Sequence, residues 1–130
     1  MAPSEPEQWH DGMQAEELKD LVVNALDDQK AKEISVLDVR GIASFTDFMV
    51  IASGTSRRHV ASLAEHVVGR AREAGVRAMG IEGGDIAEWV LVDLGDVVAH
   101  VMQPTTRGFY NLEKLWSVEA DTGEDLKTGG

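Results

Sequence analysis

A short apolar run that passes directly into a helical pattern is the feature that most constrains the fold. Residues 48–52 are all apolar and are bounded by polar or small residues, which is typical of a strand covered on both faces. Thr55 or Ser56 can then cap a helix whose apolar residues keep helical spacing as far as Ala71. Gly75 stands where a left-handed residue usually ends a helix. The run therefore predicts a buried strand followed by a helix.

The rest of the chain supplies further strands and helices. Apolar spacing predicts a first helix near 15–30, and alternation predicts a strand at 34–39, with a weaker strand candidate at 76–81. Residues 89–102 have the pattern of two strands joined by a tight Gly-Asp turn, so we expect a hairpin. Pro104 interrupts this hairpin. After it, four residues at helical spacing predict a short final helix: Phe109, Leu112, Leu115 and Trp116.

These elements predict a single α/β domain over 15–117, built on a mixed sheet. The central strand-helix-strand unit should be a right-handed crossover between parallel strands, and the hairpin adds antiparallel pairing. A chain of 130 residues suits one domain with one core. Residues 1–14 and 118–130 have no periodicity, so we expect two disordered tails, of which the C-terminal one is acidic.

Composition excludes several classes of protein. The chain has no cysteine, which excludes disulfides, thiolate metal sites and cysteine nucleophiles. No apolar run approaches the roughly 20 residues that span a bilayer. The first residues are acidic and lack the apolar segment of a secretory signal. We therefore expect a cytoplasmic protein that does not insert into membranes.

The formal net charge of −11 lies mostly at the two ends of the chain. Neutralisation of phosphates supplies most of the affinity of RNA-binding domains, and no face rich in Lys and Arg is evident here. We therefore expect little direct RNA contact. An acidic chain suits a basic protein partner, although acidity also serves solubility alone.

The turn between the predicted strand and helix, residues 53–59, stands where backbone N–H groups can hold an anion. It has one glycine and lacks the lysine of a phosphate loop, and capping by Thr55 or Ser56 explains it better. A nucleotidyltransferase would add two metal-binding carboxylates two residues apart on a strand. No such pair follows, because Asp93 and Asp96 flank a turn. We expect no cofactor.

The sequence does not arrange the histidines as a catalytic or metal-binding site. His59 and His100 could act with nearby serines and aspartates (Ser53, Ser56, Asp47 and Asp93), but no local motif arranges them as nucleophile, base and orienter. A histidine among valines, such as His100, is more often a hydrogen-bonded core or edge residue. The four histidines also lack ligand spacing, so we expect no metal and no catalytic residue.

Trp89 is the best candidate for a protein-binding residue. It follows a charged, glycine-containing loop in a chain with three Trp, three Phe and one Tyr. Alternation places Trp89 and Leu91 on one face of the hairpin and places His100 and Met102 together across it. Large aromatic residues and methionine on an exposed face are typical of a binding hot spot, although burial is their default.

Three segments of the chain resemble the RsfS/Iojap family of ribosomal silencing factors. The first is 47–60 and the second is 82–102. The third comprises Arg107, Tyr110, Leu112-Glu113 and Leu115-Trp116. The resemblance covers about residues 15–117, in order and with the family's spacing.

The resemblance implies a mixed five-stranded sheet flanked by helices, similar to nucleotidyltransferases but without their catalytic carboxylates. It implies a non-enzymatic protein that binds the large ribosomal subunit through ribosomal protein L fourteen. Bound there, it would sterically block association with the small subunit, repress translation in starvation or stationary phase, and aid large-subunit assembly. It also implies a homodimer when the protein is free.

Matched residue by residue, the family's protein-binding surface corresponds to Trp89, Leu94 and Met102, with Arg107 and Tyr110 as neighbours. Five further residues match family positions without an assigned role: Asp47, Arg58, His59, Asp93 and His100. Residues 104–106 are Pro-Thr-Thr, whereas relatives often have acidic residues there. The resemblance therefore does not give the charge at the edge of the contact surface.

Two other hypotheses remain open from the residues. The turn at Gly54-Thr55-Ser56 would fit a nucleotide-handling enzyme of nucleotidyltransferase type, which nucleotide binding with metal, or turnover, would support. The acidic tails would fit an adaptor for another basic protein. Ribosome binding that survives deletion of both tails would count against that idea.

Overall fold

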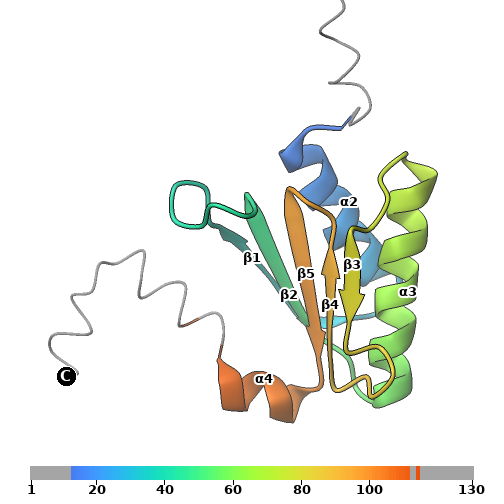
Figure 1. Cartoon of the computed structure of the whole chain (residues 1–130). Helices are drawn as coiled ribbons and strands as arrows, with labels where there is room; N and C mark the ends of the chain where they lie inside the picture. The colour runs from blue at the N-terminus through green and yellow to red at the C-terminus, as the bar shows by residue number, and fades with distance from the viewer. Residues whose placement is uncertain (1–12, 112–113, 115–130) are drawn as a thin grey trace, which may run out of the picture.

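A five-stranded mixed sheet forms the centre of the molecule (Figure 1). The computed structural model describes residues 13–111 and residue 114, so the expected tails lie almost wholly outside the described residues. The strand order β1-β2-β5-β4-β3 confirms the predicted α/β class. The elements follow the chain as α2 (Ala15–Asp28), β1 (Lys32–Asp38), β2 (Phe48–Ser53), α3 (Arg57–Glu73), β3 (Gly80–Glu82), β4 (Trp89–Asp93), β5 (Val97–Met102) and α4 (Pro104–Tyr110).

Strand pairing shows why the sheet is mixed. β1 pairs antiparallel with β2, and β2 pairs parallel with β5. β4 pairs antiparallel with both β5 and β3, so the predicted hairpin is confirmed. β2 and β3 point the same way, as expected of strands joined through a helix, but β5 and β4 lie between them. The parallel partner of β2 is therefore β5, the central strand.

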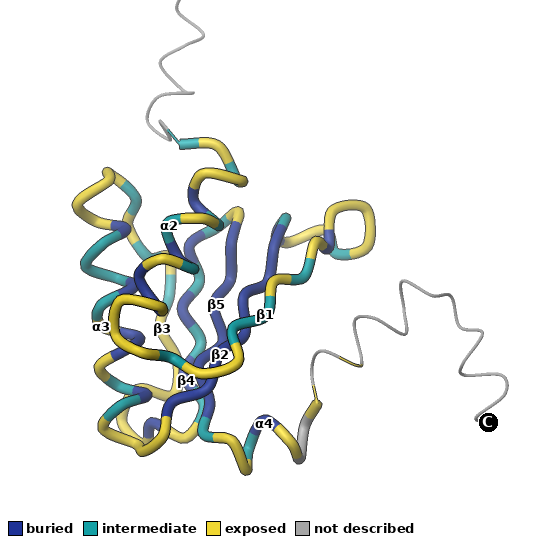
Figure 2. The backbone as a smooth tube through the Cα atoms, turned by 180° about the vertical axis from the view of Figure 1, so that it is seen from behind, coloured by how far each residue is buried: buried dark blue, intermediate teal, exposed yellow. Residues whose placement is uncertain are grey.

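α2 and α3 pack side by side on one face of the sheet (Figure 1). Their buried residues form a single core with alternate residues of the strands, which is the outcome expected of amphipathic helices. α3 begins as predicted, because the Ser56 hydroxyl accepts a hydrogen bond from the His59 backbone N–H at 3.1 Å. It ends before Gly75, whose φ of 90° is left-handed. β2 and β5 are buried along their whole length (Figure 2).

Two predicted elements differ from the structure. The third strand is only Gly80–Glu82, rather than 76–81. Val76 instead closes the end of α3, donating its N–H to the Ala71 carbonyl at 2.8 Å. The final helix begins at Pro104, because proline fits the first helical position, where no N–H is needed. Of the residues predicted to form this helix, Leu112, Leu115 and Trp116 lie outside the described residues.

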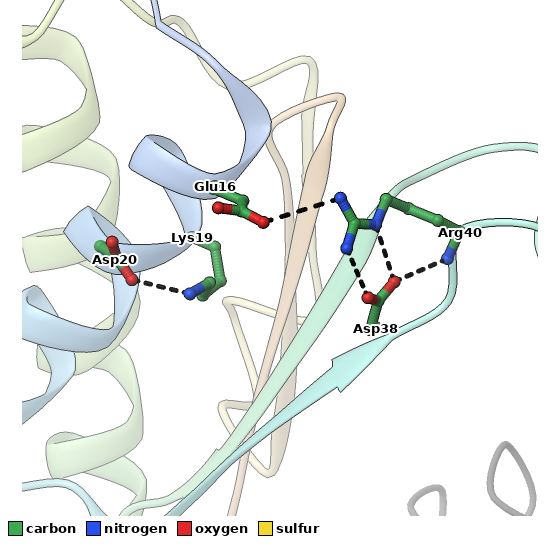
Figure 3. A network of polar contacts seen from close by, with 5 residues as sticks. All are labelled: Glu16, Lys19, Asp20, Asp38 and Arg40. Atoms are coloured by element: carbon green, nitrogen blue, oxygen red, sulfur yellow. Dashed lines mark hydrogen bonds and ion pairs between the residues drawn. The ribbon is translucent and has the colours of Figure 1, made fainter.

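A network of polar side chains lies between the end of β1 and the first turns of α2 (Figure 3). Arg40 donates two side-chain hydrogen bonds to Asp38, at 2.9 and 2.6 Å, and these bonds hold the pKa of Asp38 below its ordinary value. Arg40 also lies 3.7 Å from Glu16 of α2. Its guanidinium is 4.8 Å from the ring centre of Phe48, and the Lys19 ammonium is 5.6 Å from the same ring. The two cations cover Phe48, the first residue of β2.

Candidate binding surface around Trp89

The register of β4 and β5 decides which side chains share the sheet face that α2 and α3 leave free. Trp89 pairs with Met102, Leu91 with His100, and Asp93 with Val98. The residues between them on both strands belong to the core beneath α2 and α3. β2 contributes Met49, Ile51 and Ser53 to the same face, because they pair with Val98, His100 and Met102.

The sequence left open whether the hairpin face that holds His100 and Met102 is exposed, and the structure shows that β5 is buried. Met102 has an exposed fraction of 0%, and His100 one of 5%. β5 is the central strand, so β2 and β4 flank it on both sides along its length. Trp89, Leu91 and Asp93 of β4 are only partly buried. Met102 therefore cannot meet a partner without local movement, whereas the aromatic side chain of Trp89 remains partly exposed.

The predicted contact residues divide into two groups. Trp89 and Met102 are paired, and Met102 also pairs with Ser53. The Ser53 hydroxyl accepts a hydrogen bond from Arg107 Nη1 at 2.8 Å, so Arg107 of α4, 8% exposed, joins this end of the sheet. Leu94 does not: it is buried in the core on the helix-covered side. Tyr110 is the last residue of α4, and its side chain lies outside the described part of the chain.

A hydrogen bond that sequence reasoning missed fixes the indole of Trp89. Trp89 Nε1–H donates to His100 Nδ1 at 3.0 Å, and the two ring centres are 6.0 Å apart. Burial lowers the pKa of His100 to about 4, so the imidazole is neutral near pH 7. The hairpin register makes the two residues diagonal neighbours on one face, and this is the signal that could have revealed the pair.

The first turn of α3 is occupied by structural contacts. The His59 ring accepts from the Thr55 backbone N–H through Nδ1 at 2.9 Å, and its Nε2 lies 2.8 Å from the Gln29 carbonyl oxygen. Both ring nitrogens are therefore engaged, and His59 joins the end of α2 to the start of α3. Arg57 pairs with Glu88 at 2.8 Å, which ties this turn to the residue before Trp89. Arg58 is exposed.

The geometry does not assemble the catalytic arrangement considered from the sequence. The Ser53 hydroxyl is bonded to Arg107, and the Ser56 hydroxyl caps α3. Asp93 accepts a hydrogen bond from the Gly95 N–H at 2.9 Å, within the hairpin turn. Over residues 13–111, no group of three or more His, Asp or Glu side chains could hold a metal ion. In the same part of the chain, no helix has the length and apolar character needed to cross a membrane.

Replacing His59 by alanine should lower the free energy of unfolding by about 1–2 kcal/mol, because it removes the hydrogen bond to the Gln29 carbonyl at the end of α2 and the one from the Thr55 N–H at the start of α3. His66→Ala on the same helix is the matched control. Its ring only approaches the exposed carboxylate of Asp28, at 3.5 Å, so we expect a change below about 0.5 kcal/mol. Urea unfolding of both variants gives the comparison, and equal losses would contradict the assigned role of His59.

Comparison with known proteins identifies relatives of this chain. The sequence model of the family described as "Ribosomal silencing factor during starvation" matches residues 12–128. A ribosomal silencing factor RsfS from Halalkalibacterium halodurans is 44% identical over 104 residues, covering 80% of this chain and 89% of that protein. A mouse protein named mitochondrial assembly of ribosomal large subunit protein 1 is 38% identical over 78% of this chain and 46% of its own length.

A solved structure shares the fold. The crystal structure of a protein from Chromobacterium violaceum superposes with a TM-score of 0.80 at 45% sequence identity, covering 81% of this chain and 88% of that one. The family match spans most of the chain, and several relatives exceed 40% identity. The chain therefore belongs to the RsfS family of ribosomal silencing factors.

Proposed function

We propose that this protein binds the large ribosomal subunit through ribosomal protein L fourteen and sterically blocks its association with the small subunit. It thereby represses translation in starvation or stationary phase. The observation that carries the proposal is the partly exposed Trp89, held by His100 at one end of the sheet. A rigid, partly exposed tryptophan is the kind of side chain that dominates protein-protein binding energy.

Charge supports a basic protein as the partner. Trp89 follows Glu88 and precedes Asp93 on β4, and the chain as a whole carries a net charge of −11. Ribosomal proteins as a class are basic, so the sign of the charge favours encounter. Large-subunit binding also agrees with the name of the mouse relative, mitochondrial assembly of ribosomal large subunit protein 1. Steric blocking needs no metal, cofactor or reaction, and a protein contact needs little direct contact with RNA.

Two further properties belong to the same proposal. The protein assists late assembly of the large subunit through the binding site that it uses for silencing, in the cytoplasm. It also self-associates when free. The exposed apolar side chains of Met79, Ile81 and Ile86 lie in and beside the short edge strand β3 and offer a surface for this contact.

Co-sedimentation with purified large subunits tests the binding proposal. We expect the wild-type protein to pellet with large subunits, to bind isolated ribosomal protein L fourteen, and to lower the fraction of joined ribosomes. Trp89→Ala should weaken binding by about thirtyfold, the effect of losing a hot-spot residue. Ile42→Ala, which truncates an exposed apolar residue between β1 and β2, is the control and should bind normally.

Two results would contradict the proposal. Wild-type protein that stays in the supernatant at micromolar concentration with large subunits would exclude ribosome binding as its function. Protein that pellets with large subunits, but neither binds L fourteen nor lowers subunit joining, would exclude the proposed partner and mechanism.

A further inference from the structure

The backbone around Trp89 is fixed on both sides. Trp89 pairs with Met102 in the sheet, and the carbonyl of the preceding residue, Glu88, accepts the Gln103 N–H at 3.0 Å. The Glu88 carboxylate is in turn held by Arg57. With the main chain fixed, the orientation of the indole depends on the two side-chain torsions of Trp89. The 3.0 Å bond from indole Nε1–H to His100 Nδ1 restrains both torsions at once.

His100 is a rigid acceptor. It lies on the central strand, with Ile51 of β2 and Leu91 of β4 as its register partners. Only 5% of its surface is exposed, so neighbouring side chains on the sheet hold the ring. The acceptor can therefore define one position for the indole, which a mobile surface side chain could not do.

Packing alone does not account for a histidine at this position. Because Nδ1 accepts the indole N–H, the proton of the neutral ring must be on Nε2. Nε2 is buried and has no hydrogen-bond partner among the described residues. A buried donor without an acceptor destabilises a fold. Leucine would fill the position without that unsatisfied donor, so the advantage of histidine lies in the acceptor that it presents to Trp89.

We propose that His100 is the positioning residue of the binding surface, whose Nδ1 holds the Trp89 indole in the orientation that docks on the large subunit. This inference rests on the proposed function. Pre-organisation of this kind raises affinity, because the free protein has already restricted the side chain that the complex requires.

Two nearly isosteric substitutions separate positioning from packing. His100→Asn keeps an acceptor close to the place of Nδ1, whereas His100→Leu has a similar shape and no acceptor. We expect His100→Leu to bind large subunits about tenfold more weakly than the wild type, the effect of losing one hydrogen bond. His100→Asn should remain within about threefold of wild type. The asparagine variant should nevertheless be the less stable of the two, since it buries a polar amide.

Opposite orders of stability and binding are the readout that a purely structural role would not give. Trp89→Phe removes the indole N–H from the other side, and His100→Leu added to it should cause little further loss of binding. Circular dichroism checks that each variant is folded. If His100→Leu binds as tightly as wild type, or if the two His100 variants lose affinity equally, the positioning role is excluded. Failure of the wild-type protein to bind would instead reject the proposed function.

Discussion

Replacing Gly83 by alanine should lower the free energy of unfolding by about 3 kcal/mol, whereas Gly84→Ala should change it by less than about 0.5 kcal/mol. Gly83 has a φ of +85°, and a Cβ added there would lie 2.1 Å from the Trp89 carbonyl oxygen. No real Cβ contact is that short, so the loop or the start of β4 must move. Both strain from the left-handed backbone and the backbone clash oppose the substitution.

The adjacent glycine, Gly84, is the matched control for Gly83→Ala. A Cβ added at Gly84 meets no atom within 4 Å, and this residue lies in the same loop. Urea unfolding of both variants measures the difference. Because Gly83 contacts the backbone of Trp89, Gly83→Ala should also weaken ribosome binding, and Gly84→Ala should not. Similar stability of the two variants would show that the loop adapts freely and does not fix the start of β4.

Acidification should destabilise the wild-type protein through His100. The pKa of this histidine is about 4 in the folded protein, against an ordinary value of 6.5 in the unfolded chain. Between these values the unfolded chain binds the proton and the folded protein does not, so stability falls as the pH falls. Above pH 6.5 His100 is neutral in both states and does not reduce the free energy of unfolding. We expect protonation of His100 in the unfolded chain to lower this free energy by about 3 kcal/mol by pH 4.

Comparison of the wild type with His100→Leu isolates the effect of His100 on stability, because the carboxylates titrate in both proteins and cancel in the difference. Asp38, whose pKa is lowered from 3.8, loses its contribution below the His100 window and is common to both. Urea unfolding at several pH values between 7.5 and 4 should show that the stability of the wild type falls relative to that of the variant as the pH falls. Curves that stay parallel across this range would show that His100 is not buried as a neutral ring.

The hydrogen bond between Trp89 and His100 therefore relates the stability of the protein to its proposed binding. A neutral His100 accepts the Trp89 indole N–H, and a protonated one cannot. The burial that makes acid destabilising also keeps the acceptor available near pH 7. The fold thus supports the binding surface from the central strand, one strand away from the residue that we propose meets the partner.

Local sequence patterns determined most of the elements. The apolar run at 48–52, the caps of α3 and the alternation along 89–102 depend on spacing within a few residues, and each appears in the structure where spacing predicts it. The residues that resemble the RsfS family also predicted its five-stranded sheet. Local patterns did not predict the bounds of the third strand or the start of α4. The backbone N–H of Val76 bonds to the end of α3 instead of to a strand, and Pro104 sets the first residue of α4.

The candidate surface was decided by tertiary structure. Trp89, Leu94 and Met102 are close in the sequence pattern of the hairpin, yet only Trp89 remains partly exposed. Met102 lies on the central strand β5 and has no exposed surface, and Leu94 belongs to the core beneath the helices. The His100 acceptor, the Arg107 bond to Ser53 and the approach of Gly83 to Trp89 join residues of different elements. Spacing along a chain sets which face a side chain occupies, but burial depends on which strands and helices pack beside it.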